Sequence, residues 1–165
     1  MKCVKFWFSL ICLVLVVNGC SPLKTPTVVK YDTIESYRYV YIIPTKEFTS
    51  SVKNAYGNNN SLYSNSVAKS LNPSDVITGI LMKEGYVVLP GLRQDLVDET
   101  LIVNYGESGR RNKGLGYTIE VTIQFVSAKD RKLVGYCTAE GQGETEVDDI
   151  RKAINRALAS MFSEK

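Results

Sequence analysis

The chain contains no histidine among its 165 residues. This absence excludes Ser-His-Asp and Cys-His catalysis and removes the commonest zinc ligand. Cysteine is scarce, with four residues, and no Gly-Lys-Ser/Thr sequence ends a phosphate-binding loop. We therefore predict that the protein is not an enzyme and that it has no cofactor and no metal site. A hydrolase built on a carboxylate pair remains a weaker alternative, although no pair is recognisable from spacing.

The N-terminus carries the most specific pattern of the chain. Lys2 and Lys5 precede an apolar run over residues 6–17, which is too short to cross a bilayer as a free helix. The run ends in Val17-Asn18-Gly19-Cys20, which resembles the lipobox of bacterial lipoproteins. The resemblance implies that residues 1–19 are a signal peptide and that Cys20 receives lipid, palmitate included. An uncleaved anchor helix or an ordinary secretory signal are the alternatives.

Processing at Cys20 would change the apparent composition. Removal of residues 1–19 takes two of the 20 basic residues and none of the 17 acidic ones, which leaves a net charge of about +1. No electrostatic footprint for nucleic acid then remains. Cys3 and Cys12 leave with the signal, so Cys137 is the one free thiol, and its apolar setting predicts a core residue. No Asp follows Cys20, which favours an outer-membrane lipoprotein facing the periplasm.

The rest of the chain predicts one domain over residues 36–165. Proline and threonine over residues 20–35 suggest a tether that carries the domain off the membrane. A strand follows at 37–43, and a polar stretch that includes residues 56–61 reads as a mobile loop. Asn72, Pro73 and Asp75 begin a helix that Gly85 ends.

The C-terminal half predicts strands followed by a helix. A short strand at 86–89 and another at 100–105 precede a clear alternation over 115–125, where Thr118, Glu120, Thr122 and Gln124 form the polar face. A turn at 127–132 leads into a strand at 133–139. Apolar residues at three- and four-residue steps after Thr145 predict a final helix.

This order, β-α-β-β-β-β-α, predicts an α+β fold. Each helix has one apolar stripe, so both should cover the same face of a mixed, mostly antiparallel sheet. The result would be a two-layer sandwich whose second sheet face meets water or a partner.

Three segments are candidate sites. The segment 106–116 is rich in glycine and carries Arg110, Arg111 and Lys113, which suit a phosphate or carboxylate, although a solvated hairpin loop explains it as well. Gly141-Gln142-Gly143 superficially resembles a dinucleotide turn, but the acids that follow it favour helix capping over a pyrophosphate or Ca²⁺. Alternating tyrosines at 37, 39 and 41 suit a glycan-stacking strip or, more simply, core packing.

The domain also resembles a group of known proteins. Lys83-Glu84-Gly85-Tyr86, Gly141-Gln142-Gly143 and the helix over 150–161 are similar to small Gram-negative envelope lipoproteins of unknown function. The arrangement is also similar to the N-terminal domain of TolB and to the lipoprotein that activates penicillin-binding proteins. The resemblance and the lipid anchor together suggest a non-enzymatic binding or scaffold module with an envelope protein partner. A glycan- or anionic-lipid-binding module that uses Arg110, Arg111 and Lys113 is the alternative.

Overall fold

The computed structural model describes residues 22–56, 63–113 and 116–163. A six-stranded sheet has the order β1-β8-β7-β6-β2-β5, and a separate hairpin consists of β3 and β4. The strands are β1 (Thr27–Lys30), β2 (Tyr39–Ile42), β3 (Phe48–Tyr56), β4 (Tyr63–Leu71), β5 (Val87–Val88), β6 (Thr100–Lys113), β7 (Gly116–Ser127) and β8 (Leu133–Gly141). The helices are α2 (Pro73–Lys83) and α3 (Glu146–Phe162), with short 3-10 turns η1 (Ile34–Ser36) and η2 (Gln94–Glu99).

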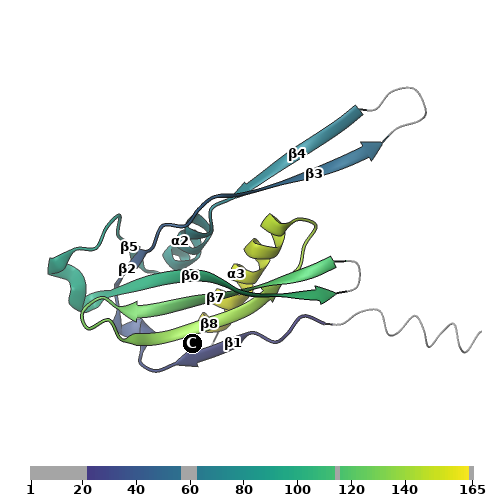
Figure 1. Cartoon of the computed structure of the whole chain (residues 1–165). Coiled ribbons are helices and arrows are strands. Elements are labelled where there is room, and N and C mark those ends of the chain that lie inside the picture. The colour runs from purple at the N-terminus through teal and green to yellow at the C-terminus, as the bar shows by residue number, and fades with distance from the viewer. Residues whose placement is uncertain (1–21, 57–62, 114–115, 164–165) are drawn as a thin grey trace, which may run out of the picture.

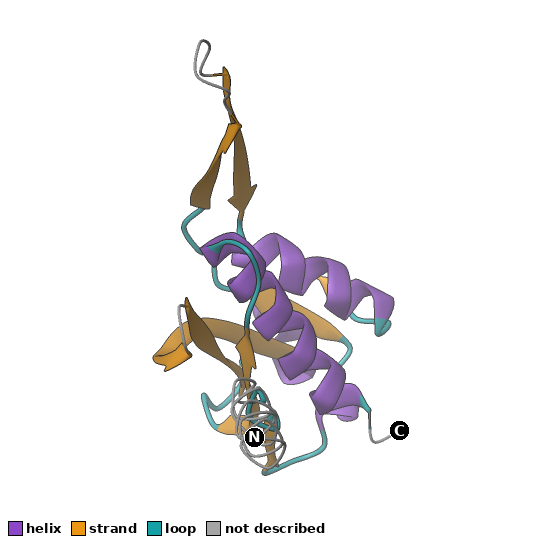
Figure 2. Ribbon diagram, turned by 90° about the vertical axis from the view of Figure 1, so that its right-hand side faces the viewer, coloured by secondary structure: helices purple, strands orange, loops and turns teal. Residues whose placement is uncertain are grey.

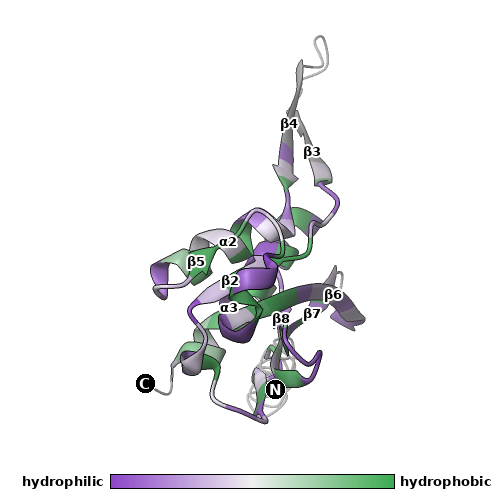
Figure 3. Cartoon of the chain, turned by 90° about the vertical axis from the view of Figure 1, so that its left-hand side faces the viewer, coloured by the Kyte–Doolittle hydropathy of each residue, from purple (hydrophilic) through white to green (hydrophobic). Residues whose placement is uncertain are grey.

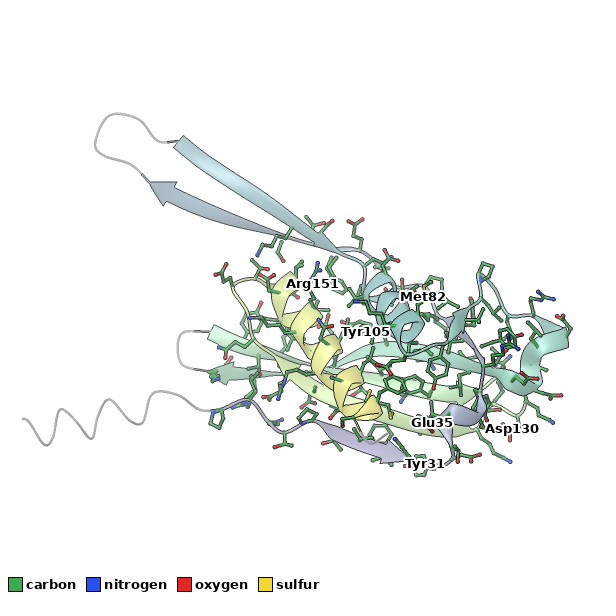
Figure 4. The ribbon with its side chains drawn as sticks, turned by 180° about the vertical axis from the view of Figure 1, so that it is seen from behind. Tyr31, Glu35, Met82, Tyr105, Asp130 and Arg151 are labelled. Atoms are coloured by element: carbon green, nitrogen blue, oxygen red, sulfur yellow. The ribbon has the colours of Figure 1, made fainter. Side chains whose placement is uncertain are left out.

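The predicted α+β class is confirmed. The sheet is mixed, because β2 runs parallel to both β5 and β6 while the other pairs are antiparallel. Both helices lie on one face of this sheet (Figures 1 and 2). Figure 4 looks onto the helices from behind, and Figure 1 looks onto the opposite face, which we call the open face.

Local sequence explains both helices. The Asn72 side chain accepts a hydrogen bond from the backbone N–H of Ser74 and caps α2, and Gly85 adopts a φ of +96° just past its end. In α3, the Thr145 hydroxyl accepts a hydrogen bond from the backbone N–H of Asp148. The caps and the glycine stop were predicted at these positions.

The core lies between the helices and the sheet. On β7 the side chains of Ile119, Val121, Ile123 and Phe125 are fully buried, as the alternation predicts. They meet the apolar stripe of α3, which includes Ile150, Ile154 and Leu158. Gly141 brings α3 close to β8, because a Cβ at this position would overlap the backbone of Asp149.

Three sequence-based expectations about elements were wrong. The stretch after residue 43 is not simply a loop: β3 and β4 pair in register from Phe48↔Leu71 to Tyr56↔Tyr63, although residues 57–62 lie outside the described chain. The predicted tether over 20–35 is packed on the domain in its described part, since residues 22–24 contact β6, β8 and α3 and β1 pairs antiparallel with β8. The 106–116 segment is mostly strand, because β6 continues to Lys113.

The hairpin of β3 and β4 projects away from the sandwich, as Figures 2 and 3 show. Its base lies near the start of α3, where Lys69 pairs with Asp148 at 2.9 Å and the Ser50 hydroxyl accepts from the N–H of Val147. Within the described residues no helix is long and apolar enough to cross a membrane.

Candidate interaction surface

Arg110, Arg111 and Lys113 lie at the C-terminal end of β6. Alternation along the strand sends neighbouring side chains to opposite faces of the sheet. Arg110 points to the helix side, where it stacks on the Tyr117 ring at 5.4 Å and meets Glu146 of α3 at 2.5 Å. Arg111 meets Glu140 of β8 on the open face. The three cations predicted as one site therefore do not converge on one point.

The Arg111–Glu140 pair joins β6 to β8 at this end of the sheet. Arg111 donates from Nε to Oε1 of Glu140 at 2.9 Å and from Nη2 to Oε2 at 2.7 Å, which is a bidentate geometry. The Glu140 side chain is only 1% exposed. The guanidinium holds the pKa of Glu140 at about 2, well below its ordinary value of 4.5, against the opposing effect of burial.

The same two side chains bind the N-terminal segment. The backbone N–H of Lys24 donates to Oε2 of Glu140 at 3.0 Å, and Arg111 also donates to the Pro22 carbonyl at 3.2 Å. Arg156 of α3 donates to the carbonyls of Glu140 and Lys24, the second at 2.9 Å. We call Arg111, Glu140, Arg156 and the backbone of residues 22–24 the N-terminal clasp.

The other two predicted cations also have partners within the chain. Arg110 contacts Glu107 at 3.3 Å in addition to Glu146, and these carboxylates raise its pKa. Lys113 Nζ donates to the side-chain oxygen of Gln142 at 2.9 Å. A ligand that used these groups would have to compete with contacts already made.

The acids after Gly143 act at the start of α3. Asp148 accepts from Thr145 and pairs with Lys69, and both contacts lower its pKa. Asp149 is 5% exposed and accepts from the N–H of Gly143, and burial raises its pKa. These contacts account for the acids as capping and packing groups. No group of three or more potential metal-ligating side chains gathers in the described chain.

Strand register arranges the open face in rows across β6, β7 and β8. Nearest the C-terminal end of β6, Arg111 lies opposite Thr118, and the next row holds Glu120 opposite Glu140. Thr118 was predicted to meet water or a partner, but it is fully buried at this clasped end, so that expectation was wrong. The following row is threonine, with the hydroxyls of Thr122 and Thr138 hydrogen-bonded at 2.8 Å.

The far half of the open face is more apolar. One row places Val29, Tyr136, Gln124 and Asn104 side by side, and the next places Leu133, Val126, Ile102 and Tyr41. Gln124 is exposed, Val126 and Tyr136 are half-buried, and Leu133 is 37% exposed, whereas Ile102 is buried at 5%. The face thus grades from ion pairs through threonines to an apolar row that no helix covers.

The predicted tyrosine strip belongs to this open face only in part. Tyr39 and Tyr41 are half-buried there, and their neighbours Val40 and Ile42 supply the buried positions of β2. The core therefore takes the aliphatic side of this strand, and the tyrosines extend the apolar row toward β5.

The helix side carries a groove of about 580 Å³ beside the hairpin base. Four of its lining side chains are charged: Glu47, Asp75, Lys83 and Arg151, the last labelled in Figure 4. Small-molecule sites are mostly apolar with a few placed polar groups, so this groove does not match one.

Of the two cysteines that the predicted mature chain retains, the structure describes Cys137 and not Cys20. Cys137 is fully buried on β8 and free, and burial raises its pKa to about 12, which fits an unreactive core thiol. Cys20 and the predicted signal peptide lie outside the described residues.

Sequence reasoning did not find the role of Glu140. Its partners Arg111 and Lys24 lie 29 and 116 residues away, so only strand register brings them together. A charged residue between Ala139 and Gly141 in an apolar strand was the one signal that pointed to it.

No family model matches the chain, and no curated protein matches it. Among solved structures, it is similar to a dodecamer of a PelC point variant from Paraburkholderia phytofirmans, with a TM-score of 0.40 and 10% identity over 83% of this chain and 96% of the other.

Proposed function

We propose that the protein is an envelope lipoprotein that acts as a non-enzymatic binding or scaffold module in envelope assembly or maintenance. In this proposal, lipid on Cys20 anchors the protein in the outer membrane, facing the periplasm. The open face of the sheet binds a protein partner.

The observation that carries the proposal is the graded open face. Protein interfaces combine an apolar centre with a polar rim. Here the accessible side chains of the apolar row are Tyr41, Val126 and Leu133. This row adjoins the row that contains Gln124, and the Thr122–Thr138 pair lies one row further on. The solvated face of an antiparallel sheet is commonly polar, so a row of neighbouring apolar side chains on this face supports binding.

The contacts of the cations favour this site over the alternative. Arg110, Arg111 and Lys113 bind Glu146, Glu140 and Gln142, and Arg111 holds a buried carboxylate. A glycan or anionic lipid would have to displace these partners. Binding by these three residues stays a prediction, with less support than binding by the open face.

In-cell photo-crosslinking tests the proposal. A benzophenone amino acid at Gln124 lies on the open face, and one at Ala159, exposed on α3, is the matched control on the other side of the sandwich. We expect a discrete protein adduct from position 124 and none from position 159. Recovery of only lipid or the protein itself from position 124 would contradict the proposal.

The anchor needs its own measurement. Cells fed a palmitate analogue should label the wild-type protein, and Cys20→Ser should abolish the label while the fold persists. Labelling that survives this substitution would contradict lipidation at Cys20.

A further inference from the structure

The N-terminal clasp has a consequence for how the domain meets a membrane. Arg111, Glu140 and Arg156 hold the backbone of residues 22–24 through three hydrogen bonds. Arg111 donates to the Pro22 carbonyl, the Lys24 N–H donates to Glu140, and Arg156 donates to the Lys24 carbonyl. Two ion pairs add to them, because Lys24 Nζ lies 3.5 Å from Glu140 and 3.1 Å from Glu120. Backbone groups held by three side chains from β6, β8 and α3 are fixed relative to the whole sandwich.

Covalent geometry then limits the distance to the predicted anchor. Cys20 precedes Pro22 by two residues, and an extended chain advances at most about 3.6 Å per residue, or about 7 Å in all. A lipid on Cys20 would therefore bring the clasped end of the sheet to the bilayer surface. It would not leave the domain on a long, free tether.

The two ends of the sheet are far enough apart to distinguish. β7 has 12 residues and advances about 3.3 Å per residue, so its ends are separated by about 36 Å. The clasped end holds the start of β7, and the turn at residues 127–132 lies at the other end, where Figure 4 labels Asp130.

The surface of the clasped end suits lipid headgroups and not the hydrocarbon core. Asn112 is exposed there, and the Lys24 side chain is 58% exposed. The large hydrophobic residues that the described chain exposes are elsewhere: Tyr31, Ile43, Met82, Val87 and Leu133. Among the described residues of this end, anchoring would thus use the covalent lipid and not the insertion of side chains.

We propose that the N-terminal clasp is a rigid mount that holds the end of the sheet where β6 ends and β7 begins against the bilayer, with the strands running away from the membrane. The inference rests on the proposed lipidation of Cys20. The mount turns the open face sideways, toward partners on the same membrane, with its ion pairs nearest the lipid and its apolar row farthest away.

The test uses the chain from Cys20, which contains every contact described above. The single tryptophan, Trp7, is absent from it, so one introduced tryptophan is a unique fluorescence donor. Cys20 is coupled to maleimide-headgroup lipid in phosphatidylcholine vesicles that also hold dansyl-labelled headgroups, while the buried Cys137 stays unreacted. Asn112→Trp reports the clasped end, and Lys129→Trp, in the turn beyond β7, reports the other.

We expect energy transfer to be several-fold stronger from position 112 than from position 129. A flexible Gly-Ser segment inserted between Ser21 and Pro22 leaves the clasp intact and should reduce this difference, so the test does not depend on a variant that fails to fold. Equal transfer from both positions, or a difference that the insertion does not change, would overturn the mount. Absence of palmitate on Cys20 in cells would instead contradict the proposed anchoring, and the two failures are separable.

Discussion

Adjacent residues of β7 point to opposite faces of the sheet, and the two faces differ in how deeply these residues are buried. On the helix side, Ile119, Val121, Ile123 and Phe125 are fully buried against α3. On the open side, Glu120 and Thr122 are half-buried and Gln124 is exposed. The helix-covered face therefore carries the stability of the fold, and the open face is free to be selected for binding. The clasped end of the open face is the exception, because Thr118 and Glu140 are as buried there as the core.

The largest expected effect comes from truncating the covered face. Ile123→Ala should lower the free energy of unfolding by about 2–5 kcal/mol, because the lost methyl groups leave a cavity beneath α3. Gln124→Ala, one residue along and on the other face, should change it by less than about 0.5 kcal/mol. Urea unfolding of the two variants measures both values. Equal losses would mean that the open face is part of a buried core.

Local sequence patterns predicted the division between the two faces, but the long-range contacts could not be predicted from them. The β7 alternation and the caps at Asn72 and Thr145 depend on residues within one or two turns of each other, so the sequence reveals them. The charged and glycine-rich end of β6 looked like a loop because β2 pairs only as far as Val103. Beyond that point β6 is a sheet edge, and charges are common on such edges.

The contacts within the candidate site could not be predicted without the strand register of the sheet. Arg111 was a candidate contact residue in the sequence, but its partner Glu140 was not. The two residues lie on β6 and β8, on either side of β7, and no local sequence pattern reveals that they meet. The hairpin of β3 and β4 was missed for a related reason. Its strands are too polar to show the two-residue period of a half-buried strand. They pair with each other as a two-stranded sheet that is separate from the main sheet.

The clasped end should show an intermediate effect. Arg111→Ala leaves the buried Glu140 without its bidentate partner and should cost about 1.5–3 kcal/mol of unfolding free energy. Lys113→Ala, two residues along the same strand, removes one contact to Gln142 and should cost less than about 0.5 kcal/mol. Chemical denaturation distinguishes the pair. Similar losses would indicate that Glu140 finds another donor.

The pH dependence of unfolding checks the same contact independently. Glu140 has a folded pKa of about 2 and an ordinary value of 4.5, so it stabilises the fold above pH 4.5, and this stability is lost as the pH falls toward 2. Glu140→Gln should flatten that part of the profile. Asp149 has the opposite sign, because its raised pKa favours the fold when it is protonated. Asp149→Asn should therefore not remove the loss of stability in acid.

The smallest expected effect on stability lies in the middle of the open face, beside the apolar row that is proposed to bind the partner. Thr122→Val breaks a cross-strand hydroxyl contact with Thr138, and such pairs contribute about 0.2–1 kcal/mol. The substitution also adds apolar surface without changing the shape of the side chain. Unfolding free energy should therefore change little, while the adduct from the crosslinker at Gln124 should weaken if the threonine row contacts the partner. A large loss of stability would mean that the hydroxyl pair holds the sheet together. An unchanged adduct would move the contact toward the apolar row of Val126 and Leu133, which the same crosslinker scanned along β8 would locate.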